Sequence, residues 1–273
     1  MRRLNSILAA AALLIPSLAH AQSYLGFDRN DYPGNAELET LRQTFAFAGY
    51  WLNNPPGEKT NTWSGKRRTI QSAGFGFLVL FNGRLYADLK SVAHAHALGK
   101  SDARQAVTAA RREGFRQGTV IFLDQEQGGR MLPEQKMYIY TWVDAVTAAG
   151  FRTGIYCSGI AAKEDAGSTI VTADDIRQNA GRRKIAFFVS NDACPPSPGC
   201  AFPNPPPNPG QSGIDFADIW QIAQSPRRAD FAAACPANYN SDGNCYPPGP
   251  ASQRVHLDVE TATSPDPSHG RGR

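Results

Sequence analysis

The sequence predicts an α/β fold of the TIM-like β/α-barrel type, in which the outer ring of helices is incomplete in the C-terminal third. Eight short apolar segments recur along the chain, and helical patterns separate most of them. About 250 residues remain once an N-terminal leader is set aside, which is the size of one such barrel. We therefore expect a parallel sheet that closes on itself.

Residues 1–21 have the features of a secretory signal peptide. Two arginines precede an apolar core at Ile7–Leu18, and Ala19-His20-Ala21 forms a cleavage site before Gln22. The apolar core is too short to remain as a membrane anchor. We expect an exported protein, periplasmic or extracellular, without a stable membrane anchor.

The expected domain covers residues 22–263, and a disordered tail follows at residues 264–273. The eight predicted strands are Tyr24–Asp28, Phe45–Leu52, Phe75–Phe81, Thr119–Asp124, Thr153–Ser158, Ile185–Ser190, Phe216–Ala223 and Val255–Val259.

Helices are predicted between most of these strands, whereas the segment 84–100 is ambiguous. The predicted helices are Ala36–Thr44, Thr62–Ala73, one that Ser101 and Asp102 open and that ends near Gly114, Pro133–Ala149 and Thr172–Ala180. Between Asn191 and Phe216 the chain is rich in proline, so a helix is missing there from the outer ring.

The charge and the cysteines narrow the class of protein. The net charge of +4 is small and the basic residues are scattered, so we expect no nucleic-acid partner. Five cysteines in an exported chain indicate two disulfides and one odd thiol. Pairing of Cys194 with Cys200 and of Cys235 with Cys245 is one of three connectivities, and Cys157 is expected to be a buried thiol.

No motif indicates a cofactor. The chain has neither a glycine-rich phosphate loop nor a serine nucleophile elbow. His94 and His96 stand at alternate positions without supporting cysteines or acids, so we expect no metal site.

Two carboxylates follow the buried strand at 119–124. Side chains alternate along a strand, so Asp124 and Glu126 point to the same side. Two crowded acids suit acid chemistry, because one can stay ionised while the pKa of its neighbour is raised. The alternative is a hydrogen-bonded pair that caps the next loop.

Further acids follow other strands. In a β/α barrel the carboxyl ends of the strands open on one face, which carries the active site. Asp28, Asp192, Asp258 and Glu260 should lie on the same rim as the pair. Trp51, Tyr156 and Trp220 lie near strand ends, where they would either stack on sugar rings or belong to the core.

Short motifs in the same order as these strands resemble the family 25 glycoside hydrolases, the Chalaropsis-type lysozymes. They are Gly26-Phe27-Asp28, Phe122-Leu123-Asp124-Gln125-Glu126, Gly154-Ile155-Tyr156, Ile219-Trp220-Gln221 and the acid of the last strand. The chain is still more similar to a sister group, the glycoside-hydrolase-like domains of exported bacterial proteins, especially over Asp102–Glu126. Arg29-Asn30-Asp31 and Gln127-Gly128-Gly129 depart from the lysozyme pattern.

The resemblance implies cleavage of β-1,4 bonds in peptidoglycan. It implies Glu126 as the general acid, Asp124 as the group that stabilises the transition state, and Asp28 and Asp258 as further acids of the cleft. Retention and inversion both remain open. A glycan-binding barrel without turnover is the second hypothesis, and an acidic cleft that binds a protein partner is the third.

Overall fold

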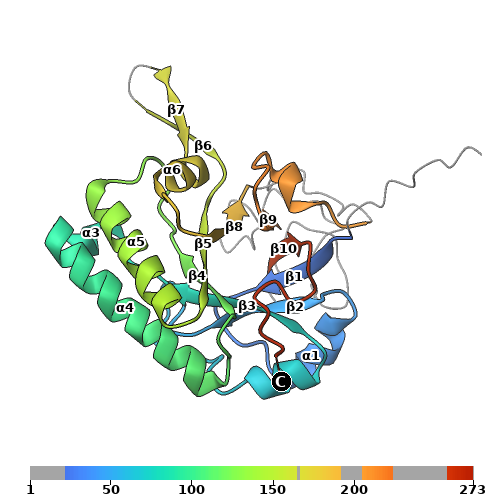
Figure 1. Cartoon of the computed structure of the whole chain (residues 1–273). Coiled ribbons are helices and arrows are strands. Elements are labelled where there is room, and N and C mark those ends of the chain that lie inside the picture. The colour runs from blue at the N-terminus through green and yellow to red at the C-terminus, as the bar shows by residue number, and fades with distance from the viewer. Residues whose placement is uncertain (1–21, 165–166, 192–204, 224–256, 273) are drawn as a thin grey trace, which may run out of the picture.

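The computed structural model describes residues 22–164, 167–191, 205–223 and 257–272. Eight strands close into a barrel in the order β1-β10-β9-β8-β5-β4-β3-β2 (Figure 1). This confirms the predicted fold class. The barrel strands are β1 (Tyr24–Asp28), β2 (Phe47–Trp51), β3 (Gly76–Asn82), β4 (Val120–Asp124), β5 (Arg152–Ser158), β8 (Ile185–Ser190), β9 (Ile219–Ala223) and β10 (Asp258–Ala262).

One strand runs against the prediction of a parallel sheet. β10 is antiparallel to both of its neighbours, β1 and β9. Asp258 is therefore the first residue of its strand and lies opposite Asp28, the last residue of β1. The prediction that the acids stand at the C-terminal end of this strand was wrong, because the strand runs the other way. Asp258 nevertheless lies at the rim where the other strands end.

Large side chains fill the inside of the barrel. The ring of Phe47 occupies the space that a Cβ on Gly26 would need, and the ring of Phe122 does the same at Gly154. Phe122 also meets Phe188 edge to face, with 6.2 Å between ring centroids. The barrel is therefore a packed core, and any site has to lie at one of its ends.

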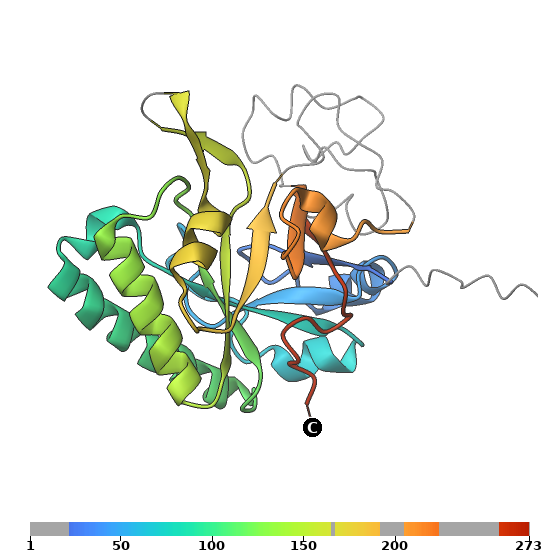
Figure 2. The same cartoon turned by 45° about the horizontal axis from the view of Figure 1, so that its top comes forward.

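Helices cover the outside of the barrel. The longest two, α4 and α5, lie side by side along one flank, as Figures 1 and 2 show. The helices are α1 (Asn35–Arg42), α2 (Arg67–Ser72), α3 (Tyr86–Leu89), α4 (Val92–Glu113), α5 (Pro133–Ala148) and α6 (Thr172–Asn179), and a short 3-10 helix covers Pro209–Ser212.

The start of α4 differs from the prediction. The hydroxyl of Ser91 accepts a hydrogen bond from His94 N at 3.2 Å and caps the helix, which then runs through Ser101 and Asp102. Asp102 is buried in the middle of α4, where it accepts two hydrogen bonds from Arg84 and one from Tyr138. Asp102, which with Ser101 looked like a helix cap, instead lies inside the helix and is the partner of Arg84 in an ion pair.

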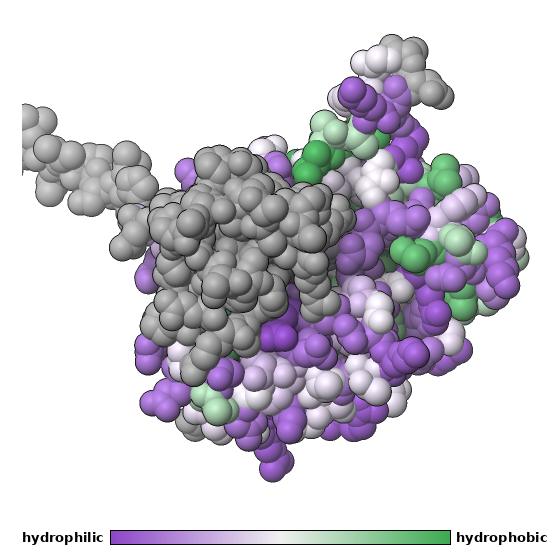
Figure 3. Space-filling model, turned by 180° about the vertical axis from the view of Figure 1, so that it is seen from behind, coloured by the Kyte–Doolittle hydropathy of each residue, from purple (hydrophilic) through white to green (hydrophobic). Residues whose placement is uncertain are grey.

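A hairpin that the sequence did not indicate follows β5. Its strands β6 (Ala161–Lys163) and β7 (Thr169–Val171) pair antiparallel and project from the barrel at the end where β5 finishes (Figures 1 and 2). On the face that Figure 3 shows, apolar residues of the described chain form small separate groups, one of them near the base of this hairpin.

The segment 264–272 is ordered, contrary to the predicted disordered tail. Ser268 is completely buried, its hydroxyl accepts a hydrogen bond from Val79 N at 2.8 Å, and its carbonyl accepts one from Val120 N at 2.9 Å. The tail therefore closes the barrel beside the first residues of β3 and β4. None of the helices within the described ranges has the length and apolar character needed to cross a membrane.

Candidate functional site

Strand β4 delivers Asp124 to the rim of the barrel. Asp124 is the last residue of β4, in register with Asn82 on one side and Tyr156 on the other. Its carbonyl accepts a hydrogen bond from Gly83 N at 3.1 Å, and Gln125 N donates to Tyr156 O at 3.0 Å. The backbone at the exit of β4 is thus held from both neighbouring strands.

The carboxyl group of Asp124 lies in an unusual environment. The residue is 4% exposed, and neither carboxylate oxygen has a hydrogen-bond partner in the part of the chain that the structure describes. Burial raises the pKa of Asp124 well above its usual range, and the charges of Glu126 and Asp28 raise it further. A buried acid without partners is costly, which is typical of a functional position.

Glu126 reaches into an open hollow beside Asp124. Although Glu126 as a whole is an exposed residue, its carboxyl group lies low enough for burial to raise its pKa. The hollow has a volume of about 290 Å³ and is lined by Pro56, Gly57, Asn82, Gly83, Arg84, Leu85, Asp88, Asp124 and Glu126. The pair therefore combines one deep acid with one that solvent and a ligand can reach.

Acids from β1 and β10 join the pair at this end of the barrel. The pKa of Tyr156 is raised well above its usual value, first by burial and then by the charges of Glu126, Asp124 and Asp258. Tyr156 donates a hydrogen bond from its hydroxyl to Gln221 Oε1 at 2.7 Å. Asp28 acts in turn on Asp124, so an electrostatic chain links the predicted residues Asp28, Asp124, Glu126, Asp258 and Tyr156.

The side chain of Asp28 lies over Gly49 of β2, where the absence of a Cβ leaves room for it. A Cβ on Gly49 of β2 would collide with the Cβ of Asp28, so Asp28 points across β2 into the barrel end. Trp51 shares the inward face of β2, where it is buried and donates a hydrogen bond from Nε1 to Arg29 O at 3.1 Å. Trp51 holds the loop after β1, next to the acid.

Trp220 is not brought to the acid cluster. Its neighbour Gln221 faces inward to Tyr156, so the alternation of β9 turns Trp220 to the opposite side. There Trp220 is buried and donates a hydrogen bond to Asn191 O at 2.7 Å. Asp192, Cys194, Cys200, Cys235 and Cys245 lie outside the described residues, and Cys157 is a buried free thiol as predicted.

Glu260, which the sequence analysis places on the rim, belongs to the acid cluster but lies deeper, inside the barrel. It is 0% exposed and lies opposite Gly26 of β1 and Gln221 of β9. Burial raises the pKa of Glu260 well above its usual range, and the charges of Asp28 and Asp258 add to the effect. The two-residue spacing of Asp258 and Glu260 in the sequence already placed them on one side of a strand.

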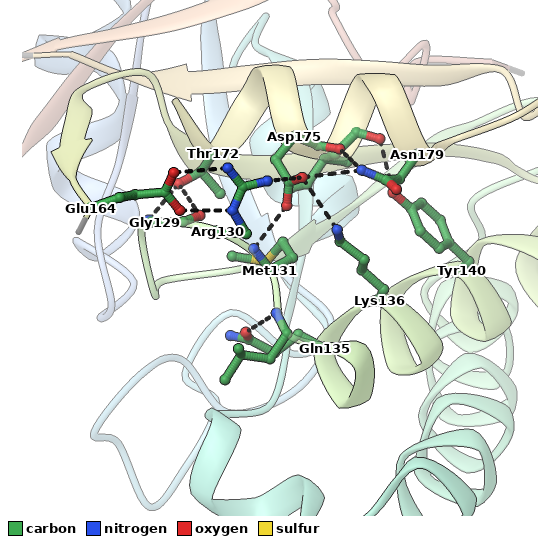
Figure 4. A network of polar contacts seen from close by, with 12 residues as sticks. Gly129, Arg130, Met131, Gln135, Lys136, Tyr140, Glu164, Thr172, Asp175 and Asn179 are labelled. Atoms are coloured by element: carbon green, nitrogen blue, oxygen red, sulfur yellow. Dashed lines mark hydrogen bonds and ion pairs between the residues drawn. The ribbon is translucent and has the colours of Figure 1, made fainter. Parts of the chain in front are cut away.

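The loop that follows Glu126 is fastened to α6 (Figure 4). Thr172 accepts a hydrogen bond from Gly129 N at 2.8 Å and donates one to Gly129 O at 3.0 Å. Asp175 accepts a hydrogen bond from Met131 N at 2.8 Å and pairs with Lys136 at 3.2 Å. These contacts fix the backbone within three to five residues of Glu126.

The hairpin is tied to the same loop. Arg130 forms two hydrogen bonds to the carboxylate of Glu164, both at 2.7 Å, and lies 3.9 Å from Asp175 (Figure 4). Within the described ranges no three His, Cys, Asp or Glu side chains are grouped so that they could hold a metal ion. His94 and His96 are exposed on α4.

Comparison with solved structures shows the same architecture in several bacterial and phage proteins. The Tat-secreted protein Rv2525c of Mycobacterium tuberculosis, solved with L-tartrate, has a TM-score of 0.54 at 12% identity, over 90% of this chain and 97% of that one. The catalytic domain of endolysin ply40 from bacteriophage P40 of Listeria monocytogenes has a TM-score of 0.51 at 14% identity, over 92% and 98%. A family 25 glycosyl hydrolase of Bacillus anthracis has a TM-score of 0.50 at 10% identity, over 89% and 90%.

At these identities the solved structures establish the fold alone. None of the curated proteins matches the sequence. One family model does match, over residues 44–197, a segment that contains β2 to β8 and both Asp124 and Glu126. Because this segment is more than half of the chain, the protein belongs to the family of Rv2525c-like, glycoside hydrolase-like domains.

Proposed function

We propose that this protein is an exported glycoside hydrolase that cleaves β-1,4 bonds of peptidoglycan, with Glu126 as the general acid. The observation that carries the proposal is the carboxyl pair at the exit of β4, in which Asp124 is buried and Glu126 opens onto the hollow. Family membership and the barrel fold agree with it.

The chemistry follows from the positions of the acids. A general acid must hold a proton near neutral pH and must reach the glycosidic oxygen. Burial raises the pKa of Glu126, and its carboxyl group lines the open hollow. The deeper acids Asp124 and Asp28 would provide the negative charge that stabilises an oxocarbenium-like transition state.

The second candidate is a glycan-binding barrel without turnover. The deep burial of Asp124 favours it, because burial raises the pKa of this carboxyl group and so favours its neutral form. A neutral acid donates and accepts hydrogen bonds to sugar hydroxyls, but it supplies no charge to a transition state. The two candidate functions use the same cleft and differ in whether Asp124 is ionised.

The test compares the purified wild-type protein with Glu126→Gln on isolated cell walls. We expect the wild type to release reducing ends and the variant to lose that activity by about 10²-fold or more, because the general acid is removed. Glu39→Gln, an exposed acid on α1, is the matched control and should keep full activity.

Two outcomes would change the proposal. Equal release by the wild type and Glu126→Gln would remove Glu126 from its role. Retention of the wild type on cell-wall glycan without any new reducing ends would favour the binding protein. Export is tested separately, by immunoblotting periplasmic and extracellular fractions for the chain lacking residues 1–21.

A further inference from the structure

A second hollow lies at the opposite end of the barrel from the acid cluster. It has a volume of about 470 Å³ and lies between α2, the last turn of α4 and the tail. Figure 1 shows these three segments near the labelled C-terminal end. We call it the basic pocket; its lining residues are Gly65, Arg67, Arg68, Gln71, Arg112, Glu113, Gly114, Arg116 and Gly272.

The one acidic residue among the described residues that line the basic pocket, Glu113, already accepts hydrogen bonds from several groups. Glu113 accepts hydrogen bonds from the hydroxyl of Tyr50 at 2.6 Å, from Gly65 N at 2.8 Å and from the hydroxyl of Ser64 at 3.2 Å. It also pairs with Arg112 at 3.4 Å. The charges of Glu113 and Arg112 therefore offset each other. The charges of Arg67, Arg68 and Arg116 are left without an acid in the described lining of the pocket.

Among the described residues, no carboxylate is paired with the buried charge of Arg67. Arg67 is 8% exposed, and its guanidinium donates to the carbonyl oxygens of Gly270 at 2.6 Å and Gly272 at 3.3 Å. The ring centroids of Phe115 and Phe77 lie 4.9 Å and 5.6 Å away. Within the described ranges its Nε has no acceptor and Arg67 takes part in no ion pair.

Positive charge is crowded around this side chain. Burial lowers the pKa of Arg67, and the nearby charges of Arg116 and Arg68 lower it further, whereas Tyr50 and Asp266 act in the opposite direction. Asp266 is engaged elsewhere, because its carboxylate accepts hydrogen bonds from three backbone N–H groups. A buried arginine is normally paired, so the pocket has an excess of positive charge that an anion would offset.

The end of α4 does not explain this excess. Cations in the last turn of a helix stabilise its C-terminal carbonyl groups, which accounts for Arg111 and Arg112. Arg68 belongs to α2, and Arg116 lies beyond Gly114, where α4 has ended. Both are exposed at the pocket and form no ion pair in the part of the chain that the structure describes.

We propose that the basic pocket binds a phosphate group, with Arg68 and Arg116 as direct donors and Arg67 as the buried charge beneath them. Guanidinium groups present paired N–H donors that match the oxygens of phosphate. The site is separate from the acid cluster and does not depend on hydrolase activity. The phosphate would belong either to a soluble compound or to a lipid headgroup.

The experiment measures binding of tripolyphosphate to the purified chain by isothermal titration calorimetry at low salt. The double variant Arg68→Gln with Arg116→Gln should bind about tenfold more weakly or worse. The control removes the same charge elsewhere, with Arg104→Gln and Arg182→Gln, two exposed arginines outside the basic pocket. It should change the affinity by less than about twofold.

A comparable loss in both double variants would show that only net charge matters, and absence of saturable binding by the wild type would overturn the proposal outright. Circular dichroism of the unliganded variants checks that each is folded. Co-sedimentation with phosphatidylglycerol vesicles but not with phosphatidylcholine vesicles, lost in the pocket variant, would identify a lipid headgroup as the source. Tripolyphosphate binding without such co-sedimentation would identify a soluble phosphate.

Discussion

Asp124 is the residue at which the proposed chemistry and the stability of the fold oppose each other. Its carboxylate oxygens lack hydrogen-bond partners among the described residues, and Glu126 and Asp28 add like charge. Folding therefore takes a group that is stable as an anion in water and disfavours that anion. Residues retained at such a cost are commonly those that a site requires.

Asp124→Asn should stabilise the protein at neutral pH. Because folding raises the pKa of Asp124, the folded state binds this proton more tightly than the unfolded state. The free energy of unfolding of the wild type therefore falls as pH rises from the unfolded pKa, about 3.9, through the raised folded pKa. The asparagine does not titrate, so we expect an advantage on the order of 1–3 kcal/mol at pH 7 that disappears below about pH 4.

Chemical denaturation of both proteins at several pH values measures this difference. Asp144→Asn, which removes an exposed acid paired with Arg183, should change the free energy of unfolding by no more than about 1 kcal/mol. A destabilised Asp124→Asn at pH 7 would mean that Asp124 is stabilised as an anion in the folded protein.

At the scale of elements, the loop after Glu126 owes its position to α6. Thr172 is completely buried and binds both the N–H and the carbonyl group of Gly129, while Asp175 binds Met131 N (Figure 4). A catalytic side chain on a loop is effective only when the backbone beneath it is held. We therefore assign Thr172 a positioning role, acting through the loop on Glu126.

Thr172→Val should lower kcat more than it changes KM, because it loosens the loop without touching the cleft. Loss of the two hydrogen bonds to Gly129 leaves polar groups unpaired and should cost about 1–3 kcal/mol of stability. Thr153→Val is the matched control. Thr153 is a buried threonine near the start of β5, at the end of the barrel away from the acid cluster. An unchanged kcat at a temperature where both variants are fully folded would show that the loop needs no such anchor.

The sequence predicted the elements better than it predicted their directions. The pair Asp124 and Glu126 was found because alternation within one strand is a local property. The reversal of β10, which places Asp258 at the rim and Glu260 deeper in the barrel, depends on pairing between distant segments and leaves no local signal. Trp220 was left open between the cleft and the core, because a strand pattern does not specify which of two adjacent residues faces inward.

On the scale of the whole molecule, the two ends of the barrel have different structures. One end gathers acids from β1, β4 and β10, and several of them act on Tyr156. The other end is closed by residues 264–272, whose composition of Pro, Ser, Gly and charged residues suggested disorder. Composition failed here because the tail is held by backbone and polar side-chain hydrogen bonds, which need few apolar residues.

Ser268→Ala tests whether this tail contributes to the stability of the barrel. The hydroxyl of Ser268 is the acceptor for Val79 N, a buried donor on β3, so its removal should leave that N–H unpaired and cost about 1–3 kcal/mol. Ser72→Ala, at an exposed position on α2, should be nearly neutral. Denaturant unfolding compares the two variants with the wild type. If Ser268→Ala unfolds at the wild-type midpoint, the tail does not hold β3, and closure of this end would then rest on the barrel strands themselves.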